Sequence, residues 1–446
     1  MKKLNYNLNI INKKYYIDSR DVKEGSIFIC LKGINNDGHK FINFVLKNFK
    51  KTIVIGEKNS KYIKNYKKNK RVILCTSTRK FIKDLAKIKR LVLNERFFIG
   101  ITGSSGKTSL KEILYSILRK YDTTYKSQKS FNNDIGLPFT LINQNKASKY
   151  NIYELGMNKL GEIDNLSRIL KPNLGVITNI GEAHLGKLGS INNIAKAKSE
   201  IIKNITRNGT IILNKDCKFY EKLKKISKLN KLKILSFGHD ERATISYEVL
   251  ELNMIKIKLR SRQFKLKLNY MSLNNIKNIL VCFLILDCLN LNINLAKNIF
   301  RTIKSIRGRG NVVKFKKKIL IVDDSYNSNP ISLKNSIFEF HNFKTKKNKI
   351  LVLGDMFELG KFSNTKHIEV GKYLKKFKFN RVYLIGQKSK QTYNQIKSTF
   401  WCKYYENIND FSKQFENVLM ENSIIMFKAS NGVGLNTLLN KKIYKC

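Results

Sequence analysis

The stretch FFIGITGSSGKTSLKEIL, residues 97–114, joins an apolar run, a glycine loop and a helix-like segment. The apolar run at residues 97–102 predicts a buried strand, and the apolar spacing after the loop predicts a helix. Glycines let backbone amides wrap a phosphate, and the positive end of a following helix favours an anion. The stretch therefore predicts a strand–loop–helix site for ATP or GTP.

The loop itself reads GSSGKT, residues 103–108. The usual G-x-x-x-x-G-K-T pattern would begin at position 101, which is Ile101, so this loop is a shorter T-G-S-x-G-K-T form. Lys107 is expected to reach the β- and γ-phosphates, and the Thr108 hydroxyl is expected to bind Mg²⁺. The predicted ATP contacts in the loop are Gly103, Ser104, Ser105, Gly106, Lys107 and Thr108.

Short apolar, β-branched runs alternate with amphipathic stretches along all 446 residues, which predicts an α/β fold with mainly parallel sheets. We expect three domains: an N-terminal domain at residues 1–92, a central nucleotide-binding domain at 93–311 and a C-terminal Rossmann-like domain at 312–446. The expected strands lie at residues 52–56, 71–75, 97–102, 173–178, 209–214, 318–324, 349–355 and 381–386.

The charge balance is extreme, because 87 basic residues face 32 acidic ones and give a net charge of +55. Such a charge would suit a polyanion such as nucleic acid or a membrane surface. The lysines are, however, spread along the whole chain, and only 3 prolines and 24 glycines occur. This composition is typical of an A+T-rich genome, so codon bias is the favoured cause of the high charge. We expect no specific nucleic-acid partner.

The seven cysteines form no C-x-x-C pair, which is typical of a reducing cytoplasm. The N-terminus has no apolar stretch of signal-peptide length. The apolar run at residues 279–289 contains Asp287 and is shorter than the roughly 20 residues of a membrane span. It predicts a buried helix, so we expect a cytoplasmic monomer without membrane insertion.

Six further segments are FNNDIGLP (131–138), ELGM (154–157), TNIGEAHL (178–185), AKSE (197–200), DDSYNSNP (323–330) and LGDMFELG (353–360). Taken in order with the glycine loop, they closely resemble the Mur ligase family, and with Asp18-Ser19-Arg20 the resemblance runs from Asp18 to the C-terminal domain. The last two segments are most similar to the branch that joins D-Ala-D-Ala to UDP-N-acetylmuramoyl-tripeptide during peptidoglycan precursor synthesis.

The resemblance implies an ATP-dependent amide-bond ligase. ATP would phosphorylate the terminal carboxylate of the tripeptide, and the amine of D-Ala-D-Ala would attack the acyl phosphate. Separate domains would close over the site, since an acyl phosphate must be protected from water.

The resemblance also implies a set of site residues. Catalysis would use Lys107, Glu154, His184 and Lys198, and the magnesium ligands would be Thr108, Glu154, His184 and Lys198, the lysine being carbamylated. Outside the loop, ATP would contact Asn275, Arg309, Asp324 and Asn327. The uridine diphosphate part would contact Ser19 and Arg20. At one position the family's histidine is replaced by Asn274, and near the C-terminus its arginine is replaced by Asn431.

Three other readings stay open. A sister ligase that adds a diamino acid to the dipeptide usually shows a D-N-P-R segment, which is absent here. A folate-type synthase would lack the N-terminal uridine segment. A basic P-loop nucleic-acid-binding ATPase would explain the charge, but the chain has no RNA-binding signature beyond it.

Overall fold

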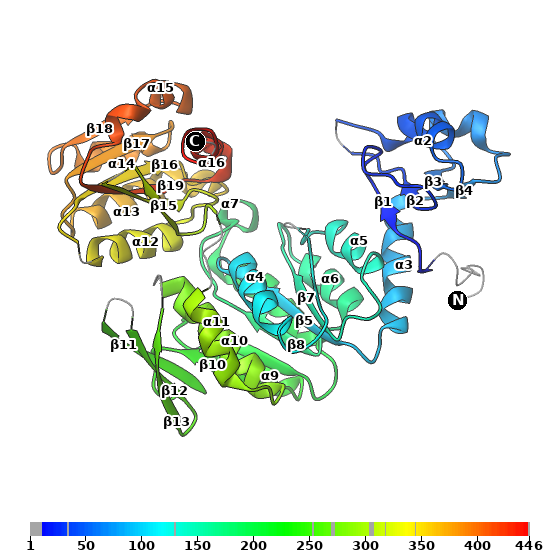
Figure 1. Ribbon diagram of the computed structural model, residues 1–446, viewed down its shortest axis with the longest axis horizontal. Coiled ribbons are helices and arrows are strands. Elements are labelled where there is room, and N and C mark those ends of the chain that lie inside the picture. Colours follow the sequence, from blue (N-terminus) through cyan, green and yellow to red (C-terminus); the bar gives the residue numbers. More distant parts are fainter. Residues whose placement is uncertain are drawn as a thin grey trace.

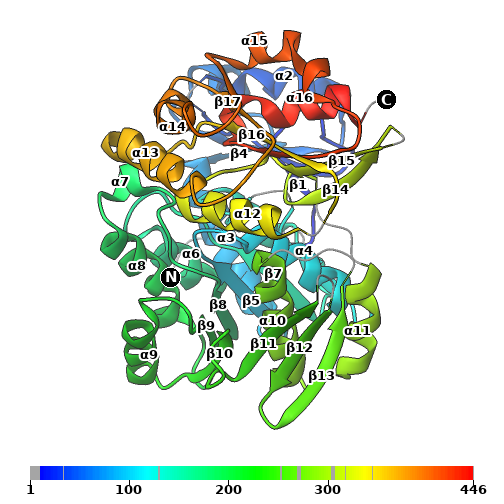
Figure 2. The ribbon, with the colours of Figure 1, turned by 90° about the vertical axis from the view of Figure 1, so that its left-hand side faces the viewer.

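The computed structural model describes residues 11–33, 35–128, 131–251, 254–268, 273–302, 307–316, 318–343 and 345–444. These residues form three sheets, each with its own helices. The N-terminal lobe (blue) and the C-terminal lobe (yellow to red) stand on the same side of the central lobe (cyan to yellow-green), as both views show (Figures 1 and 2).

The N-terminal lobe holds a four-stranded parallel sheet in the order β1-β2-β3-β4. Its strands are β1 (Tyr15–Tyr16), β2 (Ile27–Ile29), β3 (Ile53–Glu57) and β4 (Val72–Cys75). Its helices are η1 (Gly38–Phe41), α2 (Ile42–Asn48), η2 (Lys61–Tyr66) and α3 (Thr78–Val92).

Helix α3 joins the N-terminal lobe to the central lobe (Figure 1). The Ser77 side chain accepts a hydrogen bond from the Lys80 amide and so caps the start of the helix. Near its end, the buried Arg90 donates to the carbonyls of Leu170 and Lys171 at 2.7 and 2.9 Å. Because one buried guanidinium ties two lobes together, this joint should be stiff.

The central lobe holds a nine-stranded sheet in the order β13-β12-β11-β10-β9-β8-β5-β7-β6. Parallel pairing runs from β6 to β11, and β11–β13 extend the sheet as antiparallel strands. The strands are β5 (Phe97–Thr102), β6 (Thr124–Lys126), β7 (Tyr150–Glu154), β8 (Leu174–Ile177), β9 (Thr210–Asn214), β10 (Lys233–Gly238), β11 (Ile245–Glu251), β12 (Met254–Leu259) and β13 (Arg262–Lys267).

The helices of this lobe cover both faces of its sheet (Figure 1). They are α4 (Lys107–Leu118), α5 (Gly136–Ile142), α6 (Glu162–Leu170), α7 (Leu185–Leu188), α8 (Ile191–Ser199), η3 (Glu200–Asn204), α9 (Tyr220–Leu229), α10 (Leu273–Cys288) and α11 (Ile293–Thr302). Residues 280–286 of α10 are fully buried, which confirms the buried helix predicted for the apolar run.

The C-terminal lobe holds a six-stranded sheet in the order β14-β15-β19-β16-β17-β18, parallel except for β14. Its strands are β14 (Asn311–Phe315), β15 (Ile319–Asp324), β16 (Asn348–Gly354), β17 (Arg381–Ile385), β18 (Cys402–Tyr405) and β19 (Ser423–Lys428). Its helices are α12 (Pro330–Asn342), η4 (Gly360–Phe362), α13 (Ser363–Leu374), α14 (Ser389–Ile396), α15 (Ile408–Lys413), η5 (Phe415–Val418), η6 (Asn431–Val433) and α16 (Leu435–Lys442).

The predicted α/β class is confirmed, and each of the eight predicted strand runs overlaps a strand. The three sheets span residues 15–75, 97–267 and 311–428. The boundaries near residues 92 and 311 remain predictions. Within the described ranges, no helix combines the length and the apolar character needed to cross a bilayer.

Candidate active site

The glycine loop connects β5 to α4, as its sequence predicts. Gly103 has φ +148°, and a Cβ there would lie 1.9 Å from Thr178 Oγ1, so no larger residue fits without a shift. Gly106 has φ +80° and begins the helix as its N-cap. The backbone amides at this end are therefore open to an anion in the way that a phosphate loop requires.

The segment after β8 holds the loop in shape. Asn179 Oδ1 accepts hydrogen bonds from the amides of Ser104 and Ser105 at 3.0 and 2.9 Å. Thr178 Oγ1 donates to the Ser105 carbonyl at 2.6 Å, and Lys107 Nζ donates to the Gly103 carbonyl at 2.7 Å. Our sequence interpretation gave Asn179 no role, since its partners lie 74 and 75 residues away.

Glu154 ends β7 and is almost fully buried beside this loop. Its Oε2 accepts from Thr108 Oγ1 at 2.8 Å, and its Oε1 accepts from Asn132 Nδ2 at 2.9 Å. Burial opposes ionisation, but the Lys107 charge and these two hydrogen bonds outweigh it, so the pKa of Glu154 lies below its ordinary value. The Glu154 carboxylate is therefore negatively charged, and the Thr108 hydroxyl lies within hydrogen-bond distance of it.

Lys198 lies on α8 with 2 % of its side chain exposed. Burial and the neighbouring Lys107 charge hold the pKa of Lys198 well below its ordinary value, although Glu154 partly opposes this. The lysine predicted from the resemblance is thus an amine that loses its proton easily beside the glycine loop.

A cavity of about 260 Å³ lies between the central and C-terminal lobes. Glu154 and most of the predicted nucleotide residues line it together. Gly103 and Lys198 are not among the lining residues, but each neighbours Lys107. The predicted residues in the lining are Ser104, Ser105, Gly106, Lys107, Thr108, Glu154, His184, Asn275, Arg309, Asp324 and Asn327.

The C-terminal wall of the cavity is built around Asp324 at the end of β15. Its Oδ2 accepts from Lys428 Nζ at 2.6 Å and from Ser336 Oγ at 2.8 Å. Lys428 is buried and also donates to the Asn327 carbonyl at 3.3 Å. The Arg309 guanidinium lies over the Tyr326 ring, 4.2 Å from its centroid. Lys428, which we did not predict as a site residue, is the cation closest to Asp324.

His184 enters the cavity from the central lobe with φ +64°, an uncommon conformation for this residue. Its Nδ1 lies 2.8 Å from Glu358 Oε2 in the C-terminal lobe. The contact has ion-pair distance, but Nδ1 has no hydrogen-bond partner of good geometry among the described residues. The contact with His184 is the main cause that lowers the pKa of Glu358, against the effect of burial.

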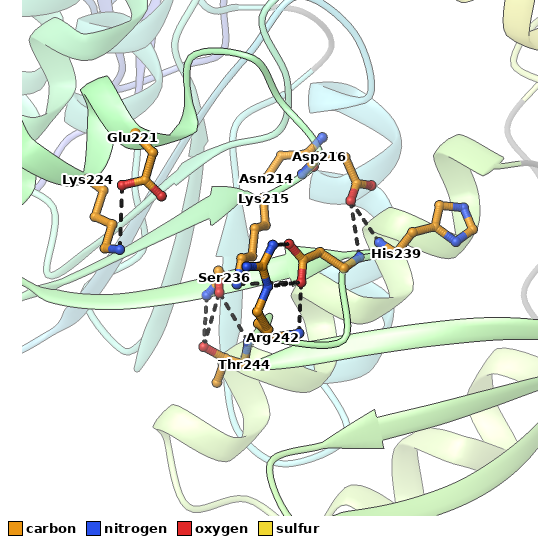
Figure 3. Close-up of polar contacts among 10 residues, drawn as sticks. Asn214, Lys215, Asp216, Glu221, Lys224, Ser236, His239, Arg242 and Thr244 are labelled. Atoms are coloured by element: carbon orange, nitrogen blue, oxygen red, sulfur yellow. Dashed lines mark hydrogen bonds and ion pairs between the residues drawn. The ribbon is translucent and has the colours of Figure 1, made fainter.

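Helix α10, which carries Asn275, is fixed at two places. Asn278 Nδ2 donates weakly to the Gly106 carbonyl at 3.5 Å, and Lys277 Nζ lies 2.8 Å from Asp216 Oδ2. Asp216 in turn accepts from the His239 amide at 2.8 Å, next to a second cluster in which Asp240 pairs with Arg242 (Figure 3). Asn275 therefore lies in the cavity wall on a helix that contacts both the glycine loop and Asp216.

Ser19 and Arg20 lie in the N-terminal lobe and do not line this cavity. Ser19 is buried, whereas the Arg20 side chain is 86 % exposed and pairs with Asp18 at 2.6 Å. Their assignment to a uridine diphosphate subsite remains a prediction.

Thr108 and Glu154 fit a magnesium ion, because this hard cation prefers oxygen ligands and these two oxygens already touch. An uncharged amine such as Lys198 is a poor magnesium ligand, but carbamylation would convert it into an anionic oxygen donor. The donor set is therefore consistent with magnesium when Lys198 is carbamylated.

Comparisons with known proteins agree with this geometry. The Mur ligase middle domain matches residues 101–286, and the Mur ligase, glutamate ligase domain, matches residues 308–431. A UDP-N-acetylmuramoyl-tripeptide–D-alanyl-D-alanine ligase of Rickettsia prowazekii is 32% identical over 95% of this chain and 93% of its own length.

Solved structures extend the likeness to the whole fold. MurF from Acinetobacter baumannii has a TM-score of 0.86 and 26% identity, covering 96% of this chain and 92% of that one. The MurF ligase of Thermotoga maritima, solved in complex with ADP, has a TM-score of 0.84 and 27% identity, covering 98% and 99%.

The three-lobed α/β fold and the cavity at its seam define an ATP-dependent ligase. More particularly, the chain belongs to the Mur ligase family, and its relatives fall in the D-alanyl-D-alanine-adding branch.

Proposed function

We propose that this chain joins D-Ala-D-Ala to the terminal carboxylate of UDP-N-acetylmuramoyl-tripeptide with ATP, in the cytoplasm. The observation that carries the proposal is the shared cavity, where the glycine loop and Glu154 of one lobe face Asp324 and Arg309 of another. Full-length similarity to curated ligases of this activity supports it.

The chemistry brings two anions together. A carboxylate oxygen of the tripeptide attacks the γ-phosphorus, the bond to ADP breaks, and an acyl phosphate forms. The amine nitrogen then attacks the acyl carbon, gives up a proton, and phosphate leaves. Lys107 and Arg309 both line the cavity, where they would neutralise the phosphates. Closure of the lobes over the site would limit access of water.

Thr108 and Glu154 would hold one magnesium ion, with His184 and carbamylated Lys198 completing a second site. When bound, the metal would neutralise negative charge on the phosphates and on the attacking carboxylate oxygen. The lowered pKa of Lys198 supports its part, because only a neutral amine reacts with CO₂.

The two substrates would approach from different sides. We assign the uridine diphosphate part to the N-terminal lobe, with Ser19 and Arg20 as contacts. A second cavity of about 610 Å³ lies at the ends of β16, β17 and β18, lined partly by Glu358, Lys388 and Gly432. We assign the dipeptide to it, since Glu406 offers a carboxylate for an ammonium group and Lys388 a cation for a carboxylate. Glu358 contacts His184 instead.

The test is phosphate release from ATP with each substrate present or absent. We expect release above background only with both UDP-muramoyl-tripeptide and D-Ala-D-Ala, and none from Lys107→Ala. UDP-muramoyl-dipeptide with a diamino acid tests the sister ligase, and RNA tests the nucleic-acid ATPase. Release that ignores both ligase substrates would overturn the proposal.

A further inference from the structure

The central and C-terminal lobes meet through two loops beside the cavity. The first precedes α7, and the second, residues 355–360, follows β16. The Gly186 amide donates to the Glu358 carbonyl at 2.8 Å, and Lys366 Nζ lies 2.7 Å from Glu182 Oε1. We call this set of contacts the clasp.

The clasp brings together two residues in a strained conformation. His184 and Glu358 both have φ +64°, although neither is glycine. Such a conformation costs free energy, so it persists only where surrounding contacts over-determine it. The strain points to a role for the facing side chains, whose Nδ1 and Oε2 atoms lie 2.8 Å apart.

The loop that presents Glu358 is rigid. The Asp355 carboxylate accepts from the Ser389 amide at 2.6 Å, and the Met356 amide donates to His367 Nε2 at 3.1 Å. The Phe357 amide donates to Ser430 Oγ at 2.8 Å. Because three successive residues are anchored to other elements of the C-terminal lobe, the Glu358 carboxylate moves with that lobe as one body.

We propose that Glu358 is a positioning residue that orients the His184 ring, so that the metal side of the site is complete only when the C-terminal lobe is seated. The inference rests on the proposed function. A carboxylate beside one ring nitrogen fixes the orientation of a histidine ring and so directs the other nitrogen. His184 lines the nucleotide cavity and Glu358 lines the second cavity, so the pair links the two.

The test compares Glu358→Gln with Lys366→Met. Gln keeps the size of the side chain and the same backbone strain at φ +64° while removing the charge. Lys366→Met is the matched control, because it removes another ion pair of the clasp without touching His184. The readouts are the Mg²⁺ concentration at half-maximal phosphate release and the Mg²⁺ dependence of ADP binding by calorimetry.

We expect Glu358→Gln to raise the Mg²⁺ requirement in both readouts by about 10-fold or more, as for other residues that support metal ligands. Lys366→Met should stay within about twofold of the parent. Equal shifts in the two variants would reduce the clasp to a structural contact, and no shift in Glu358→Gln would overturn the inference.

ADP binding also separates the two proposals. The Mg²⁺ dependence of ADP binding reports on the metal site even if the protein makes a different amide product. Failure of the substrate-dependent phosphate release in the parent protein would instead remove the proposed function itself.

Discussion

Three buried lysines interact with one carboxylate at the heart of the site, and two of them, Lys107 and Lys111, lie outside the proposed metal ligands. Lys107, Lys111 and Lys198 all interact with Glu154, and Lys111 Nζ is fixed by the Ser127 carbonyl at 2.9 Å. Burial lowers the pKa of each lysine, and Glu154 opposes the shift. This imbalance of charge is what a site for a triphosphate and a carboxylate requires.

Lys198→Ala should reduce amide synthesis by at least about 100-fold, comparable to the loss of a metal-supporting residue. Added short carboxylates should restore part of the activity, because they can supply the missing anionic oxygen. Steady-state phosphate release with and without acetate measures both effects. Full activity in the variant would remove Lys198 from the metal site.

Lys89 gives a prediction about pH. It is 4 % exposed, its Nζ donates to the Ile11 carbonyl at 3.2 Å, and burial lowers the pKa of Lys89 to about 8. At pH 7 the folded state must bury a charge. Above pH 8 the folded state releases this proton while the unfolded state keeps it, so stability rises with pH.

Lys89→Met should therefore be more stable than the parent at pH 7, by roughly 1–3 kcal/mol. The advantage should shrink steadily towards pH 10, where the unfolded lysine also becomes neutral. Urea unfolding at pH 7, 8.5 and 10 measures the difference. If the stability advantage of Lys89→Met over the parent grew with pH, the predicted direction of the pH dependence would be wrong.

Residue contacts differ in how far sequence can predict them. The glycine loop is a local pattern, so its residues and conformation could be read directly. Asn179, Lys428 and Glu358 act through partners 74 to 174 residues away in sequence. Asn179 and Glu358 lie in segments that resemble the family, but no local spacing shows which residues they contact. Lys198 was predicted only through the family resemblance, since burial is a property of the fold.

At the scale of elements, the strands were predictable because parallel sheets buried on both faces need continuous apolar runs. Strands β11–β13 were not predicted, because buried and half-buried residues alternate, as in β12, and give no continuous apolar run. The fully buried β19 was not among the predicted runs either. The clasp was also not predictable, since it joins two loops from different lobes.

Gly186 offers a way to open the clasp. It is not in a glycine-only conformation, but a Cβ there would lie 2.5 Å from the Gly360 nitrogen across the seam. Gly186→Ala should therefore fold normally but hold the lobes apart, and reduce activity by roughly 10-fold or more through loss of the closed site. Small-angle scattering should show a larger radius, and unfolding should show a nearly unchanged midpoint.

For the molecule as a whole, we expect the +55 charge to act on the association of substrates rather than on the chemical step. Both nucleotide substrates are anions, so the positive field should favour their encounter and salt should weaken it. Raising NaCl from about 50 to about 200 mM should increase KM for the UDP-linked substrate several-fold and leave kcat nearly unchanged.

RNA gives the matching control. We expect it to bind weakly at low salt, to dissociate by about 200 mM NaCl, and never to stimulate phosphate release. Stimulation by RNA would favour the nucleic-acid ATPase instead.

The crowding of lysines around Glu154 has a consequence beyond catalysis. In the absence of ligand, the Lys107 and Arg309 charges repel one another in the cavity, and this repulsion is a standing cost to the native state. A bound nucleotide relieves this repulsion and therefore stabilises the native state as well as serving as a substrate. The supply of nucleotide would then determine how long the protein resists heat and proteases.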